Sequence, residues 1–145
     1  MKKTKIMPAT RDARGNISDI FYNHPIDHVA GVNSKKGVFR GDHYHKKTIQ
    51  HMYMTRGSLR YYYRHVSQDN SKVKSIKIAQ GEMVTTPPYE VHALEILEEN
   101  QFIVFSEGRR GGKDYEVDTF RVKPSLIIKK RVMENENLTN HSHSK

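Results

Sequence analysis

Three histidines and one glutamine are spaced along the sequence so that they can share one site. His43 and His45 form a His-x-His pair, Gln50 follows shortly after them, and His92 stands in a separate segment. Three imidazoles and an amide oxygen can bind one divalent cation, and an imidazole can also carry a proton near neutral pH. The sequence contains no cysteine, so histidine, carboxylate or amide groups would have to hold a metal.

These residues can converge only if β-strands position them. Side chains two positions apart lie on the same face of a strand, so His43 and His45 point the same way. By the same period, His92 shares the inner face of its strand with Leu94 and Ile96. A barrel brings two such strands together around one interior. We therefore predict that the histidines and Gln50 meet inside a barrel.

Short β-branched and aromatic segments, separated by turn residues, recur along most of the chain. They predict strands at residues 17–22, 28–32, 50–55, 58–65, 73–78, 83–86, 91–97, 101–105 and 119–122. The pattern indicates an all-β protein, with one barrel domain over residues 1–123. Residues 124–145 end in a polar stretch rich in Asn, His and Ser, and we expect a largely disordered tail there.

The spacing of the site residues resembles the paired motifs of the cupin superfamily. Gly37 lies six positions before His43, and Gly57 lies seven positions after Gln50. The resemblance implies a double-stranded antiparallel β-helix, which is a jelly-roll or cupin barrel. It also implies a single divalent metal ion, with zinc, iron, manganese and nickel not distinguished, and no organic cofactor. Gln50 stands where the family usually has glutamate, which removes one negative charge from the site.

Two further segments resemble nucleotide-sugar enzymes. Residues 12–21 read Asp-Ala-Arg-Gly-Asn-Ile-Ser-Asp-Ile-Phe, and residues 40–44 read Arg-Gly-Asp-His-Tyr. Similar segments occur in dTDP-4-dehydrorhamnose 3,5-epimerases, in sugar 3,4-ketoisomerases and in the cupin half of capsule-synthesis enzymes. The resemblance implies an isomerase or epimerase that acts on a nucleotide-linked 4-keto-deoxysugar in cell-surface polysaccharide biosynthesis.

This resemblance suggests a role for several residues. His43 is the expected base, because an imidazole can both take and return a proton near neutrality. Arg40 is expected to bind the diphosphate of the substrate, and Lys46 and Lys47 to add positive charge. A metal bound to the same nitrogen of His43 would exclude the base role and would instead polarise the sugar carbonyl. Both assignments stay open at this point.

Two positions depart from the epimerase pattern. Met52 stands where the classical epimerase has a catalytic lysine, and Phe105 stands near its proton-donating tyrosine. Tyr61, Tyr63 and Tyr115 are the candidates to replace this donor, and Tyr61 and Tyr63 are also expected to contact the substrate. The incomplete machinery leaves two alternative functions, which are a metal-dependent cupin dioxygenase and a non-catalytic module that binds a sugar or an anion.

The composition limits the partners and the location of the protein. The 145 residues carry a formal net charge of +9, which favours an anionic ligand. We find no nucleic-acid-binding motif and no apolar run near the roughly 20 residues that cross a bilayer. We therefore expect a cytoplasmic protein without membrane insertion or a nucleic-acid partner. A homodimer is expected, because pairing of N-terminal strands between subunits hides sheet edges.

Overall fold

The protein is represented by a computed structural model, which describes residues 1–127. This part of the chain forms strands and two 3₁₀ turns, and none of its elements is a helix long and apolar enough to span a membrane. The elements in chain order are β1 (Lys2–Lys5), β2 (Thr10–Asp12), β3 (Gly15–Ile17), β4 (His28–Ser34), β5 (Phe39–Tyr44), β6 (Ile49–Arg56), β7 (Ser58–His65), η1 (Asn70–Lys72), β8 (Lys74–Ala79), β9 (Glu82–Thr86), β10 (Glu90–Ile96), β11 (Asn100–Glu107), η2 (Gly112–Asp114) and β12 (Phe120–Arg121).

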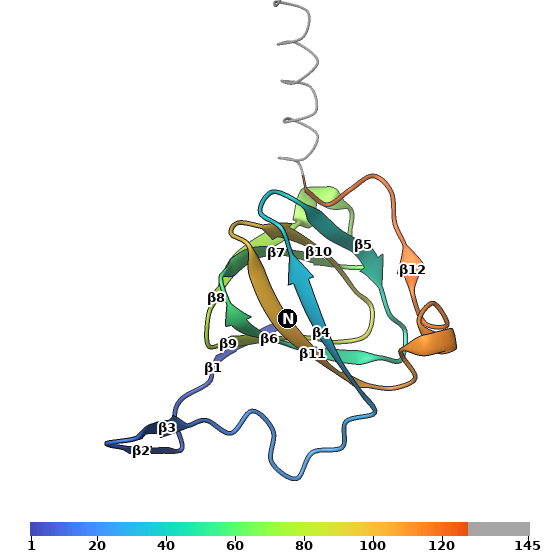
Figure 1. Ribbon diagram of the computed structural model, residues 1–145. Helices are drawn as coiled ribbons and strands as arrows, with labels where there is room; N and C mark the ends of the chain where they lie inside the picture. The colour runs from blue at the N-terminus through green and yellow to red at the C-terminus, as the bar shows by residue number, and fades with distance from the viewer. Residues whose placement is uncertain (128–145) are drawn as a thin grey trace, which may run out of the picture.

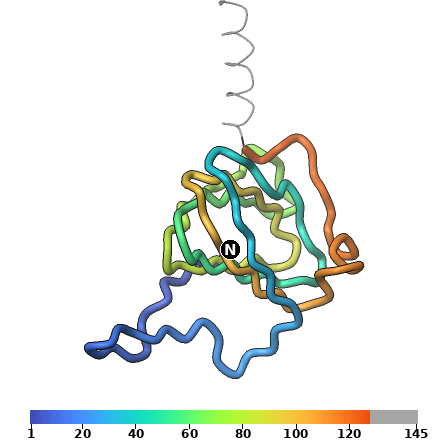
Figure 2. Tube along the Cα trace, in the orientation of Figure 1, coloured from blue at the N-terminus to red at the C-terminus, as the bar shows by residue number. Residues whose placement is uncertain are grey.

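Two five-stranded sheets curve around a common interior (Figure 1). The first sheet has the strand order β1-β9-β6-β11-β4, and the second has the order β12-β5-β10-β7-β8. All pairings are antiparallel, and most neighbours are distant in sequence, as in a jelly roll. The hairpin β2–β3 stands apart from both sheets on an extended N-terminal segment (Figures 1 and 2). The predicted all-β jelly-roll barrel is therefore confirmed.

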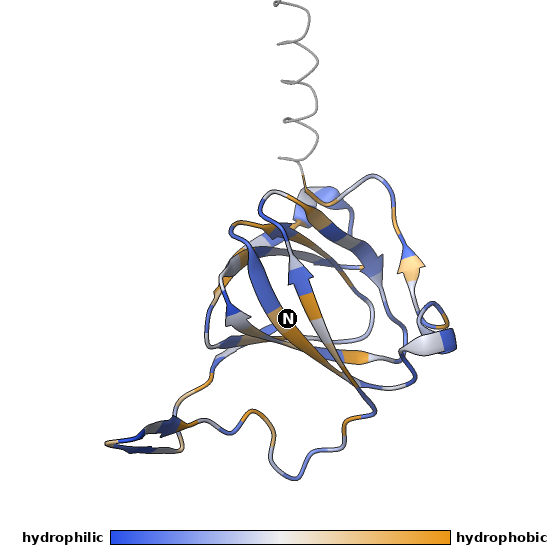
Figure 3. Cartoon of the chain, in the orientation of Figure 1, coloured by the Kyte–Doolittle hydropathy of each residue, from blue (hydrophilic) through white to orange (hydrophobic). Residues whose placement is uncertain are grey.

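The barrel interior is built from alternating residues of the central strands. Figure 3 shows that single strands carry both apolar and polar residues, which allows one face to pack inward. The buried core includes Met54, Leu59, Ile96 and Phe102 from four strands. Full burial of such a side chain stabilises the fold by about 2 kcal/mol. Leu94 belongs to this core and also lines the cavity that holds the histidines, so the core positions the site.

The end of the described chain packs against the outer face of β10. Leu126 and Ile127 are 1% and 0% exposed and form a buried cluster with Val91 and Ala93. The backbone N–H of Leu126 also donates to the carboxylate of Asp42 at 3.0 Å. The packed domain thus continues beyond the predicted end at residue 123, because two apolar residues cover the sheet. The rest of the predicted tail, residues 128–145, lies outside the described residues.

Most predicted strands are present, and β7 has its predicted bounds. The strand expected at residues 17–22 is absent, since β3 ends at Ile17 and no strand occurs in residues 18–27. Ile17 and Tyr22 are 66% and 89% exposed, so these side chains do not pack against either sheet. Conversely, β1 is a strand that the sequence did not predict. Its residues Lys2–Lys5 lack the apolar pattern of a strand but pair with β9.

Candidate active site

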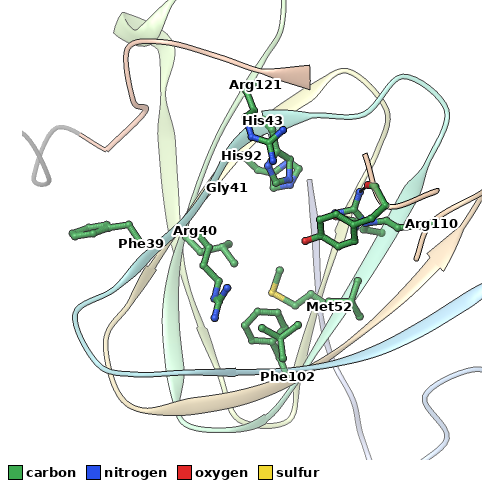
Figure 4. A pocket seen from close by; sticks show the side chains of 14 residues that line it. Phe39, Arg40, Gly41, His43, Met52, His92, Phe102, Arg110 and Arg121 are labelled. Carbon is green, nitrogen blue, oxygen red and sulfur yellow. Dashed lines mark hydrogen bonds between the residues drawn. The ribbon is translucent and has the colours of Figure 1, made fainter. Parts of the chain in front are cut away.

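His43 and His92 lie opposite each other on the paired strands β5 and β10. Their ring centroids are 4.6 Å apart, and Figure 4 shows both rings at one side of the same cavity. The register shifts next to His92, where Gly41 has a φ of 95°. A β-carbon on Gly41 would lie 2.8 Å from the His92 carbonyl oxygen. Glycine therefore allows the two strands, and with them the two rings, to approach each other.

His45 and Gln50 complete the cluster. The His45 ring centroid lies 5.0 Å from that of His43 and 5.4 Å from that of His92. His45 Nε2 lies 3.2 Å from Gln50 Oε1, and the two residues are only 1% and 8% exposed. The structure thus brings together the four residues that the sequence places on two separate segments.

A backbone carbonyl orients each of the three imidazoles. His45 Nδ1 lies 2.6 Å from the carbonyl oxygen of Asp118, and His92 Nδ1 lies 3.1 Å from that of Glu90. The ring of His43 is hydrogen-bonded to the backbone two residues before it. A ring nitrogen that donates to a carbonyl leaves the other nitrogen with a free lone pair.

These lone pairs make the cluster suitable for a cation. One nitrogen from each of His43, His45 and His92 lies within 4.8 Å of the others. The amide oxygen of Gln50 adds a fourth donor beside them. Carbonyl groups that fix the ring tautomers in this way are typical of histidines that bind metal. The residues therefore fit one divalent ion.

Burial lowers the pKa of all three imidazoles. The pKa of His43 falls to about 3, because burial disfavours its charged form and because His45, Arg110 and Arg121 add positive charge nearby. Burial likewise lowers the pKa of His45 and takes that of His92 well below its ordinary value. The three rings are therefore neutral near pH 7, which is the state that accepts a proton or binds a metal.

Asp118 fixes the loop that follows β5 and carries His45. Its carboxylate accepts hydrogen bonds from the backbone N–H groups of Lys46, Lys47 and Thr48 and from the Thr48 hydroxyl, at 2.8 to 2.9 Å. Burial alone would raise the pKa of Asp118, but these bonds outweigh it and lower the pKa to about 2. Because its backbone carbonyl also accepts from His45, Asp118 orients both the loop and the ring.

The histidine cluster borders a cavity of about 310 Å³ inside the barrel (Figure 4). Met52 and Phe102 form part of an apolar wall across from the histidines in Figure 4. Arg40, Arg110 and Arg121 line the same cavity and give it positive charge. A cavity of this size is typical of small-molecule sites, and its guanidinium groups suit a phosphate or diphosphate.

Contacts with the protein hold the three arginines in place. Arg40 Nε donates to the Ser34 hydroxyl at 2.9 Å, and an Arg110 nitrogen donates to the Thr119 hydroxyl at 2.9 Å. Arg121 forms an ion pair with Glu116. A guanidinium has five N–H donors, so each of these contacts leaves donors free for a ligand.

The structure places Lys46 and Lys47 outside the cavity. Their side chains are exposed, and their backbone N–H groups bind Asp118. The Lys46 ammonium lies 4.3 Å from the ring centroid of Phe120. Arg40 lines the cavity and the two lysines do not, and the roles predicted for these residues in substrate binding stay predictions.

Tyr61 and Tyr63 are also not on the cavity wall. Tyr61 is 0% exposed, and its hydroxyl donates to Glu90 at 2.8 Å. Its ring stacks in parallel with that of His92, with 6.0 Å between centroids. Tyr63 is partly buried and packs against the core. Both tyrosines pair with inner residues of β10, but the core covers them. Tyr61 therefore supports His92, and neither tyrosine lines the cavity, although both were expected to contact the substrate.

Sequence reasoning missed the arginines that follow β11. The segment 108–112, which the sequence analysis gave no role, contains Arg110, and Arg110 lines the cavity. Tyr115 and Arg121 follow Arg110 in the sequence and line the same cavity. The sequence offers one signal for this site, which is the arginine pair Arg109 and Arg110 between two glycines shortly after the predicted strand at residues 101–105.

Solved structures with the same fold include several nucleotide-sugar enzymes. The 3,4-ketoisomerase QdtA from Thermoanaerobacterium thermosaccharolyticum, solved in complex with TDP, has a TM-score of 0.68 and 20% identity over 90% of this chain and 95% of that chain. The dTDP-4-dehydrorhamnose 3,5-epimerase from Sulfolobus tokodaii also has a TM-score of 0.68 and 20% identity, over 86% and 77% of the two chains. At such identities the likeness establishes the cupin fold.

A capsular polysaccharide protein shares the fold over part of its length. CapF from Staphylococcus aureus has a TM-score of 0.59 and 20% identity, over 82% of this chain and 33% of that chain. No curated protein matches the sequence. Residues 10–120 match the family described as the polysaccharide biosynthesis C-terminal domain, and this match includes the whole histidine cluster. The chain therefore belongs to the polysaccharide biosynthesis C-terminal domain family.

Proposed function

We propose that this protein is an isomerase or epimerase that moves a proton next to the keto group of a nucleotide-linked 4-keto-deoxysugar. The observation that carries the proposal is that two neutral histidines, His43 and His92, and three arginines line one cavity. The histidines can carry a proton or hold a cation, and the arginines can bind a diphosphate. Membership of a polysaccharide-biosynthesis family, and neighbours solved with TDP, support the same substrate class.

In one assignment, His43 is the base. The keto group acidifies the hydrogens on the neighbouring carbons, so removal of one of them gives an enolate. His43 would accept this proton at the nitrogen that does not bind the backbone. Burial is the main cause of the low pKa of His43, and it makes the ring a weak base in the free protein. A bound diphosphate would offset the smaller contributions of Arg110 and Arg121 and so raise this pKa. Return of the proton to the other face or to another carbon gives the epimer or isomer.

In the other assignment, His43, His45, Gln50 and His92 hold one divalent metal ion. The position of His45 supports this assignment. If His45 Nδ1 donates to the Asp118 carbonyl, His45 Nε2 and Gln50 Oε1 are two acceptors only 3.2 Å apart, and a cation bound to both would stabilise this arrangement. When bound, the ion supplies an electrophile that polarises the keto group. His43 then has no free nitrogen for the proton. Tyr115, on the cavity wall, would first release its hydroxyl proton to solvent, then accept the proton from carbon as a phenolate and return it as a phenol.

We also propose that the protein works in the cytoplasm as a homodimer. Nucleoside diphosphate sugars are made from nucleoside triphosphates, which cells keep in the cytoplasm. Exposed apolar side chains on the N-terminal segment, such as Ile17 and Tyr22, support a partner surface.

Proton exchange with solvent tests the proposed activity. The protein is incubated in deuterated water with dTDP-, UDP- and GDP-linked 4-keto-6-deoxy sugars, and the sugars are examined by NMR. We expect deuterium at C3 or C5 of one of them. His43→Asn should abolish this exchange, whereas the control His65→Asn, at an exposed position of β7, should leave it unchanged. A wild-type protein that exchanges no proton of any of these sugars would contradict the proposal.

Metal content distinguishes the two assignments. If the cluster holds an ion, His43→Asn, His45→Asn and His92→Asn should each lower metal content and exchange together. Chelation should then stop the exchange, and Tyr115→Phe should abolish it. If His43 is the base in a metal-free site, chelation should have no effect, and proton abstraction should persist in Tyr115→Phe.

A further inference from the structure

We infer that His24, His51 and Glu107 form a second divalent-metal site, on the outer face of the barrel. His51 lies in β6, Glu107 ends β11, and His24 comes from the segment 18–27 that follows the N-terminal hairpin. One nitrogen or oxygen from each residue lies within 4.8 Å of the others. Two imidazoles and one carboxylate are a common ligand set for zinc.

The two imidazoles converge on a single carboxylate oxygen. His51 Nε2 lies 2.6 Å from Glu107 Oε2, and His24 Nε2 lies 2.9 Å from the same atom. Without a metal, both rings would have to donate an N–H to this oxygen. A zinc ion can replace these two hydrogens, since neutral imidazole nitrogens and a carboxylate oxygen are then all directed at one point.

Strand alternation separates this cluster from the one inside the barrel. Gln50 and His51 are consecutive in β6, so Gln50 points into the cavity and His51 points outward. Phe105 is paired with His51 in the sheet, and Glu107 lies two residues further on the same outer face. A metal at His51 therefore shares no ligand with the barrel interior.

The surroundings of His51 suit a metal ligand. Its Nδ1 lies 2.8 Å from the Thr85 hydroxyl, which can accept the Nδ1 proton and leave Nε2 free for the ion. Hydrogen bonds from His51 and His24 lower the pKa of Glu107, so its carboxylate is ionised at neutral pH. The side chain of His51 is 9% exposed, whereas those of His24 and Glu107 are 39% and 29% exposed. An ion could therefore enter from the solvent side and keep a bound water.

The ring of Phe21 packs against the imidazoles of both His24 and His51 and keeps them close together. Its ring stacks on His24 with centroids 5.3 Å apart, and contacts His51 edge-on at 4.9 Å. It also packs against Phe105 at 5.0 Å. A metal would add a bond between the segment 18–27, which lacks strands, and the sheet. We therefore assign this site a structural role, which is to fix the N-terminal segment on the barrel.

Zinc stoichiometry tests the second site. All proteins carry His141→Gln and His143→Gln, so that the C-terminal histidines add no zinc. Zinc bound per chain is measured after equilibrium dialysis at pH 7.5 with a weak competing chelator. We expect His24→Gln to bind one zinc ion fewer than its parent, and His65→Gln, a matched substitution of an exposed histidine, to bind the same number. Equal zinc content in His24→Gln and the parent would overturn the inference.

Two more variants protect the test from misfolding and from effects of the barrel site. Thr85→Val keeps the ligands but removes the hydroxyl that orients His51, so zinc should still bind, about 10- to 100-fold more weakly. His92→Asn removes a residue of the barrel cluster, and the loss caused by His24→Gln should persist in that background. The result is therefore independent of the proposed function. Cobalt absorption bands that are unaffected by His24→Gln would also refute the second site.

Discussion

The residue at one inner position of β6 decides which groups can carry the proton. Met52 lies on the apolar cavity wall, at the position where the epimerase resemblance implies a lysine. A thioether neither donates nor accepts protons in water, so the remaining titratable groups on the wall must do so. Apart from the arginines, these are His43, His92 and Tyr115 among the described lining residues. His92 is 3% exposed, so His43 and Tyr115 have the best access to a ligand.

Replacement of Arg110 should weaken binding of the nucleotide. Arg110→Ala removes one guanidinium from the cavity, and we expect dTDP affinity, measured by calorimetry, to fall about tenfold or more, which corresponds to about 1.4 kcal/mol. Arg109→Ala is the matched control, because this neighbouring side chain is 75% exposed and pairs with Asp114 instead. Equal losses in both variants would indicate a general effect of net charge rather than a phosphate-binding role.

A methyl group at Gly41 should separate the two strands that carry His43 and His92. The added β-carbon would meet backbone atoms of β10, at 2.8 Å from an oxygen and 3.0 Å from a carbon, and would also have an unfavourable φ. We expect Gly41→Ala to lower the free energy of unfolding by about 3 kcal/mol in urea titrations. Gly37→Ala has a similar φ but open space, and should cost only about 1 kcal/mol. Equal costs would argue against the steric explanation.

At the scale of elements, the loop between β5 and β6 depends on contacts from another segment. It has few backbone hydrogen bonds of its own, and Asp118 supplies the missing acceptors from the segment before β12. Asp118 is followed closely by Phe120 and Arg121 of β12, which pair with Tyr44 and His43 in the sheet. The chain after β11 is thus a strap that fixes both the loop and one edge of the second sheet.

Removal of the Asp118 carboxylate should destabilise this loop in a pH-dependent manner. The folded-state pKa of about 2 is below the ordinary value of 3.8, so the carboxylate stabilises the fold above about pH 4 and loses this effect as the pH falls toward 2. We expect Asp118→Ala to lower the free energy of unfolding by about 1 to 2 kcal/mol at pH 7, after allowance for solvent screening.

The acid limb of the stability curve provides the check. The difference between the wild type and Asp118→Ala should shrink between pH 4 and pH 2, and Asp118→Asn should show an intermediate loss because its amide oxygen can still accept. A difference that stays constant over this range would mean that the charge of Asp118 does not contribute.

At the scale of the whole molecule, the sequence predicted what depends on local spacing. Strand alternation and the two motifs were enough to place His43, His45 and His92 together, because His43 and His92 lie on paired strands and His45 directly follows the strand that carries His43. The contribution of Arg110 could not be predicted, because the path of its loop across the cavity depends on tertiary packing. The prediction that Tyr61 contacts the substrate has the same limit, because the sequence alone does not show which tyrosines are buried in the core.

The N-terminal segment and the neighbouring edge strand carry exposed apolar side chains that a second copy of the chain could cover. Met7, Ile17, Tyr22 and Val29 are 62%, 66%, 89% and 56% exposed, although all four are apolar or aromatic. Val29 lies on β4, which is an edge strand of the first sheet. Unpaired edges and exposed apolar side chains are features that association with another copy would cover. We expect this surface to form the interface of the proposed homodimer.

Charged substitutions on this surface should therefore produce monomers. In sedimentation equilibrium at micromolar concentration, the wild type should have twice the 16.9 kDa mass of one chain. Tyr22→Glu combined with Val29→Glu should sediment as one chain, because burial of each of these side chains contributes roughly 2 kcal/mol and a buried unpaired carboxylate adds a further penalty. Val117→Glu, which changes another exposed valine outside the N-terminal segment, should remain dimeric. A wild-type protein with the mass of a single chain would rule out the dimer, and a dimeric double variant would place the interface on a different surface.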